Sequence, residues 1–169
     1  MQPDDLDARL VQLLTDEPQL PVLECARRLG VARGTVTSRL ARLHANGVVS
    51  AIVPQVDPAG FGYDLVAFCF VDIIQNVGHG PVTEAILSAI PEVTDLYTVT
   101  GDHDLHLRVV ARNGQDLQDV LDRISQLAGV ARTSSSLALR THIQGRTLPL
   151  LHAVADSTPT DRSGGSGRS

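Results

Sequence analysis

The segment from residue 21 to residue 47 constrains the fold more than any other part of the sequence. Apolar residues recur there at helical spacing in two short runs, and Gly30 separates the runs, where a helix stop favours a positive φ angle. Ala26 is small where two crossing helices would crowd, and Val31 and Val36 are apolar where they would pack. This spacing predicts a helix-turn-helix whose second helix enters the major groove of DNA.

The second helix of this motif is expected to present a basic and polar face. Arginine donates to phosphate or guanine, and small hydroxyl groups reach phosphate or base. Between residues 21 and 47 one acid, Glu24, stands against five arginines, in a chain with a net charge of −5. A helical hairpin of another fold with solvated arginines is the competing interpretation, but the spacing and the local charge together favour DNA binding. The predicted DNA contacts are Arg33, Gly34, Thr35, Thr37, Ser38, Arg39 and Arg42.

The flanking residues complete a DNA-binding domain over residues 1–53. Residues 4–15 begin with acids and continue with a leucine stripe, which predicts a third helix. Residues 48–53 favour β structure, as expected of a winged helix-turn-helix. Proline and glycine then mark a linker at residues 54–63.

The second half alternates in type and predicts a ferredoxin-like domain over residues 64–155. Its order is βαββαβ, so the chain as a whole is expected to be α+β. The expected strands are 65–74, 94–100, 105–111 and 130–141, and the expected helices are 81–90 and 116–128. Residues 148–151 are expected to add an edge strand. Residues 156–169 are rich in Ser, Gly, Thr and Pro and predict a disordered tail.

The first strand of that domain predicts self-association. Both faces of residues 65–71 are apolar, yet the helices of a βαββαβ unit cover only one face of the sheet. The open face holds either Val66, Phe68 and Phe70 or the residues that alternate with them. A second copy of the sheet is the simplest cover, so we expect a homodimer that pairs two DNA-binding units.

Cysteine and hydropathy patterns exclude several other classes of protein. Cys25 and Cys69 lie far apart without companions at zinc spacing, so both are expected to be small core residues. No apolar run reaches the length of a membrane span, and no signal pattern opens the chain. We expect a cytoplasmic protein without metal or cofactor.

Several strings in the sequence resemble one family of regulators. They are LGVARGTVTSRLARLHANGVV, VDPAGFGY, IPEV, VTGDHDLHLRVVA and LAGVARTSSSLAL. Together they resemble the Lrp/AsnC family of bacterial and archaeal transcription regulators (feast/famine regulatory proteins) over about residues 4–151. Ser38 departs from the arginine that many members have, and His103 departs from a turn position that is often aromatic.

The resemblance implies that the second domain binds a small effector, typically an amino acid, between subunits. It also implies that dimers can assemble into an octamer. The glycine and acid of the family's GxxD turn correspond to Gly101 and Asp104. A glycine turn lets backbone N–H groups approach a carboxylate, and acids accept from an ammonium group. The predicted effector residues are Gly101, Asp102, Asp104, Ser134 and Ser136.

Two competing hypotheses stay open. One is an enzyme on a ferredoxin-like scaffold that uses the cluster Asp102, His103, Asp104 and His106, although no phosphate loop or nucleophile elbow supports it. We predict that the chain is not an enzyme. The other is a DNA-binding regulator or architectural protein whose second domain serves only in oligomerisation.

Overall fold

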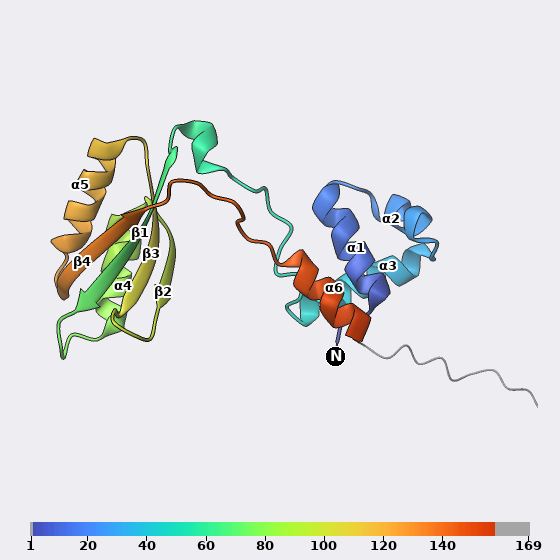
Figure 1. Ribbon diagram of the computed structural model, residues 1–169. Coiled ribbons are helices and arrows are strands. Elements are labelled where there is room, and N and C mark those ends of the chain that lie inside the picture. The colour runs from blue at the N-terminus through green and yellow to red at the C-terminus, as the bar shows by residue number, and fades with distance from the viewer. Residues whose placement is uncertain (1, 158–169) are drawn as a thin grey trace, which may run out of the picture. The chain divides into compact units, whose positions relative to one another are not determined.

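The computed structural model describes residues 2–157 (Figure 1). The described chain divides into two compact units, one formed by residues 2–54 together with residues 143–157, and the other by Gln55–His142. Among the described residues, no helix is both long enough and apolar enough to cross a membrane. The predicted disordered tail begins at residue 156, but Asp156 and Ser157 end a helix, and residues 158–169 lie outside the described part.

The first unit contains the predicted three helices, α1 (Asp5–Asp16), α2 (Val22–Leu29) and α3 (Arg33–Ala45). The apolar stripes of the three helices pack against one another and form a shared core. The core side chains are Leu10, Cys25, Ala26, Val36 and Leu43. The three-helix prediction is therefore confirmed.

A fourth helix belongs to this unit. The predicted edge strand at residues 148–151 is wrong, because these residues begin α6 (Leu148–Ser157), which packs against α1. Pro149 explains the difference: it cannot donate to a strand ladder, but it fits the first turn of a helix. Residues 143–157 thus join the first unit, whereas the sequence predicted that residues up to 155 belong to the second domain.

The stretch 48–53 forms no strand in the described chain. The N–H groups of Val48 and Val49 instead donate to the carbonyl of Leu43 at 2.9 and 3.2 Å. These two bonds close the C-terminal end of α3, and among the described residues of this unit no strand is available to pair with the segment.

The second unit is the predicted βαββαβ fold. Its strands are β1 (Leu65–Ile73), β2 (Val93–Thr98), β3 (Leu105–Ala111) and β4 (Val130–Leu137), in the sheet order β2-β3-β1-β4 with antiparallel neighbours. Its helices are α4 (His79–Ala89) and α5 (Gly114–Ser125), and the short 3-10 helix η1 (Pro58–Phe61) precedes β1 (Figure 1).

Both helices cover the same face of the sheet. Val82 and Ile86 of α4 and Val120 and Ile124 of α5 pack in one core with the buried side chains of the strands. In β1, Ala67, Cys69 and Val71 face this core, whereas Val66, Phe68 and Phe70 lie half-buried on the other face. The open face therefore holds the aromatic set of the two alternatives.

The two cysteines are free and buried, as predicted for core residues. Burial raises the pKa of the Cys69 thiol to about 11, so this thiol stays protonated and unreactive at neutral pH.

Candidate DNA-binding and effector sites

The turn of the helix-turn-helix is built as its glycine predicts. Gly30 ends α2 with φ 69°, a left-handed conformation that most other residues adopt at a cost. The N–H of Val31 donates to the carbonyl of Ala26 at 3.0 Å, which satisfies the end of α2 and directs the chain into α3.

The predicted DNA contacts on α3 divide by exposure. Arg33, Gly34, Thr37 and Ser38 are exposed, whereas Thr35 is half-buried. Val36 and Leu43 on the opposite side of α3 are buried in the core, so the exposed residues form the outward face of the helix. These positions suit the predicted contacts, which remain a prediction.

Arg39 and Arg42 have partners that the sequence analysis did not anticipate. Arg39 Nη1 bonds Asp7 Oδ1 at 3.0 Å and also bonds Asp4 Oδ2, and Arg42 Nη2 bonds Asp7 Oδ2. The Asp7 side chain is 0 % exposed, and those of Arg39 and Arg42 are 24 % and 27 % exposed. Both arginines therefore join α3 to the start of α1.

The two acids also cap α1. The N–H of Asp7 donates to Asp4 Oδ1, and the N–H of Asp4 donates to Asp7 Oδ2, both at 3.0 Å, which is a reciprocal capping box. Partial burial would raise the pKa of Asp4, but the hydrogen bonds from Arg39 and from the Asp7 backbone hold it below its ordinary value.

The other three arginines of the motif differ in whether an acid neutralises their positive charge. Arg27 and Arg28 both bond Glu24, at 2.7 and 3.0 Å, and Arg28 also bonds Glu17. Within the described chain, Arg33 is the one arginine of the motif that forms no ion pair with an acid. The basic patch expected from the sequence is thus mostly neutralised, and its uncompensated charge lies at the start of α3.

The predicted effector turn joins β2 to β3. Gly101 and Asp102 are exposed, and Gly101 adopts φ 115°. Asp104 returns toward β1: its Oδ2 accepts from the N–H of Ile73 at 2.7 Å, and its Oδ1 lies 3.9 Å from His79 Nε2. Asp104 thereby fixes the end of the hairpin, and Asp102 stays open to solvent.

The predicted serines lie elsewhere on the sheet. Ser134 is paired with Phe70 and Ser136 with Phe68, so both serines are on the open face. Strand β1 separates β4 from β3, a spacing of roughly 10 Å across two ladders. The structure therefore does not bring the serines into contact with the hairpin turn within one chain.

Three polar side chains that the sequence did not single out together connect the turn to β4: Asp72, His103 and Arg132. Asp72 Oδ1 accepts from His103 Nδ1 at 2.7 Å, and Asp72 Oδ2 accepts from Arg132 Nε at 2.7 Å. These partners hold the pKa of Asp72 below its ordinary value, with the His103 hydrogen bond as the main cause. The residues lie far apart in sequence, so only the register of the sheet shows their contact.

The titratable cluster proposed for an enzyme does not converge. His103 hydrogen-bonds Asp72, Asp104 accepts from the N–H of Ile73, and His106 stacks on Phe70. In residues 2–157 no three metal-ligating side chains gather at one point.

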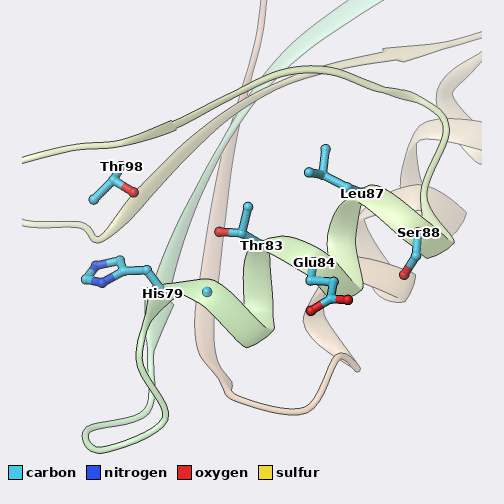
Figure 2. A pocket seen from close by; sticks show the side chains of 7 residues that line it. His79, Thr83, Glu84, Leu87, Ser88 and Thr98 are labelled. Carbon is cyan, nitrogen blue, oxygen red and sulfur yellow. The ribbon is translucent and has the colours of Figure 1, made fainter.

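An open pocket of about 660 Å³ lies between α4 and β2 (Figure 2). Figure 2 shows its lining residues, which are His79, Gly80, Thr83, Glu84, Leu87, Ser88 and Thr98. His79 connects the pocket to Asp104. No spacing in the sequence distinguished these residues from an ordinary helix surface.

Comparison with known proteins covers both units. Residues 4–44 match the AsnC-type helix-turn-helix domain, and residues 67–148 match the Lrp/AsnC ligand binding domain. The regulator AldR of Mycolicibacterium smegmatis is 32 % identical over 84 % of this chain and 84 % of its own length. The regulator FL11 of Pyrococcus horikoshii is 28 % identical over 87 % of this chain and 96 % of its own.

Solved structures agree with these sequence relatives. A feast or famine regulatory protein of M. tuberculosis complexed with L-methionine has a TM-score of 0.73 and 31 % identity, over 85 % of this chain and 96 % of its own. An L-Met complex of the Neisseria meningitidis regulator NMB0573 has a TM-score of 0.74 and 25 % identity, over 89 % of this chain and 98 % of its own. Both units, their order along the chain and their similarity to these proteins show that this chain belongs to the Lrp/AsnC family of transcriptional regulators.

Proposed function

We propose that this regulator contacts double-stranded DNA through the outward face of α3. The observation that carries the proposal is the exposed, uncompensated Arg33 at the start of a helix whose other side is buried. The N-terminal residues of a recognition helix are those that approach base edges, and an unpaired arginine gains most from phosphate or guanine. Gly34, Thr35, Thr37 and Ser38 complete this contact surface.

Selection of bound genomic fragments tests this assignment. The wild-type protein is expected to enrich a limited set of fragments, and Arg33→Ala is expected to lose that enrichment while its melting temperature stays unchanged. Arg9→Ala is the matched control, because Arg9 is an exposed arginine of α1. Equal enrichment by wild type and Arg33→Ala would contradict the assignment.

We also propose that the second domain binds an amino acid. The support is that two similar structures contain L-methionine, and that Gly101 and Asp102 leave a glycine turn and a free carboxylate at the surface. Asp102 and Asp104 would accept from the ligand's ammonium group, and the backbone N–H groups near Gly101 would bind its carboxylate. Ser134 and Ser136, about two strands away, would contribute hydroxyl donors only across a subunit interface.

Thermal shift against a panel of amino acids tests the effector proposal. A ligand that binds the folded protein raises its stability by mass action, about 2.7 kcal/mol at one hundred times the dissociation constant. Asp102→Asn is expected to abolish the shift, whereas Asp64→Asn, which alters another exposed acid of the same unit, is expected to keep it. If no amino acid shifts the wild type, the second domain is an oligomerisation module only.

A homodimer, with the octamer as its higher assembly, is the proposed state in the cytoplasm. The half-buried row Val66, Phe68 and Phe70 on the open face of the sheet supports it, because apolar side chains there gain from a second sheet.

A further inference from the structure

Two acids and two arginines lie together in the contact between α1 and α3. Asp7 has both carboxylate oxygens engaged and no exposed surface, and each of its two arginines comes from α3. Asp4 adds a second carboxylate, which Arg39 shares. Two carboxylates face two guanidinium groups, so the cluster is neutral.

A neutral cluster of this kind contributes little to DNA affinity. Binding to phosphates is driven by release of the cations condensed on the DNA, and a guanidinium already neutralised by a carboxylate displaces few of these cations. Arg39 and Arg42 therefore differ in role from Arg33, although all three are arginines of one helix.

The same cluster fixes the orientation of α3. Hydrogen bonds between a guanidinium group and a carboxylate have a specific geometry. Here Arg39 and Arg42, which are three residues apart on one face of α3, both bind Asp7 of α1. A helix held at two points of one face cannot roll about its axis. The exposed face with Arg33, Thr37 and Ser38 is thereby held outward.

We propose that Asp7 is a positioning residue for DNA recognition, which acts through Arg39 and Arg42 and does not touch DNA itself. This inference rests on the proposed function of α3. It separates the arginines of the helix into one that contacts DNA and two that hold the helix in place.

The slope of binding affinity against salt concentration distinguishes the two roles. Each lost phosphate contact lowers the magnitude of the slope by about 0.9 for duplex DNA. Arg33→Ala is expected to lower it by that amount. Arg42→Gln is expected to keep the wild-type slope. Arg42→Gln and Asp7→Asn are each expected to weaken binding to a selected fragment at least about tenfold, which is about 1.4 kcal/mol.

A second readout separates positioning from loss of folded protein. Partial unfolding lowers binding to selected and unrelated DNA equally, whereas a misplaced α3 lowers binding to the selected fragment more. Asp7→Asn is expected to reduce the ratio of these two affinities. Asp5→Asn is the matched control, because Asp5 is an exposed acid in the same helical turn and its carboxylate lies 3.6 Å from Arg9 of α1.

If the wild type binds DNA, each result of these experiments either supports or overturns the proposal. The proposal is overturned if Asp7→Asn folds and keeps both the wild-type affinity and the wild-type ratio of affinities for selected and unrelated DNA. It is also overturned if Arg42→Gln lowers the slope of affinity against salt concentration as much as Arg33→Ala does. If Asp7→Asn does not fold, Asp4→Asn replaces it, because Asp4 is partly exposed and holds Arg39. Failure of the wild type to bind DNA would refute the proposed function instead.

Discussion

Phe70 and His106 stack on the open face of the sheet, with ring centroids 4.7 Å apart and planes inclined by 11°. Phe68 and Tyr97 lie against the same imidazole at 5.4 and 6.4 Å. The register explains the cluster, because Phe70 and Tyr97 are the two cross-strand partners of His106. The face that lacks helices is thus an aromatic surface suited to self-association.

Phe70→Asp is expected to dissociate the proposed dimer without unfolding the chain. A carboxylate placed in an apolar interface stays unpaired, and we expect the dissociation constant to rise at least about 100-fold. Sedimentation equilibrium measures the change. Leu87→Asp is the control, since Leu87 is an exposed apolar residue of α4, which covers the opposite face. A Phe70→Asp protein that stays dimeric would place the interface elsewhere.

Ala155→Asp is expected to destabilise the first unit by about 2–4 kcal/mol, because it buries an unpaired carboxylate where α6 packs on α1. Urea unfolding followed by circular dichroism measures the loss. Leu150→Asp in the same helix, at a side chain that is 68 % exposed, is expected to change stability little. Equal effects of the two substitutions would mean that α6 does not contribute to the unit.

Glu24→Gln is expected to reduce the acid sensitivity of the helix-turn-helix. Hydrogen bonds from Arg27 and Arg28 lower the pKa of Glu24 from 4.5 to about 2. A pKa lowered by folding contributes stability above pH 4.5, and this contribution is lost as the pH falls toward 2. Melting temperatures between these values should fall less steeply for Glu24→Gln than for wild type. The exposed Glu84→Gln should leave the slope unchanged, and parallel slopes for all three proteins would refute the assignment.

Gly129→Ala is expected to destabilise the second unit more than Gly101→Ala does. Both glycines have positive φ, 95° and 115°, so both substitutions carry backbone strain of about 1–2 kcal/mol. Only at Gly129 would the new methyl lie 2.8 Å from side-chain atoms of Val77 and Val82, which adds about 1–3 kcal/mol of overpacking. Thermal unfolding measures the difference, and equal losses would show that the two valines move aside freely.

The fold was largely predictable from the sequence, because its signals are local. Gly30, the small Ala26 and the apolar Val31 and Val36 specify the helix-turn-helix, and alternation of strand and helix patterns specifies the βαββαβ order. Helix α6 was missed because residues 148–151 are a short apolar run, which periodicity alone does not assign to helix or strand.

The chemistry of the site was less predictable, because its contacts are distant in sequence. Arg39 and Asp7 are 32 residues apart, and Asp72 and His103 are 31 apart. Residues 21–47 contain five arginines and one acid, but three of the acids that neutralise four of these arginines lie outside this segment, in α1 or at its two ends. Only the packed structure shows that Arg33, among these arginines, has no acidic partner in the described chain.

The proposed function of an effector-responsive regulator requires that amino-acid binding by the second domain change DNA binding by the first, and a DNA titration measures this coupling most directly. Affinity for a selected fragment is determined with and without the amino acid that raises the melting temperature. An effector shifts binding by its differential affinity for the two states, typically about 5–150-fold. Such a shift is expected for the wild type, and its loss is expected for Asp102→Asn. An identical DNA affinity with and without a bound amino acid would contradict it.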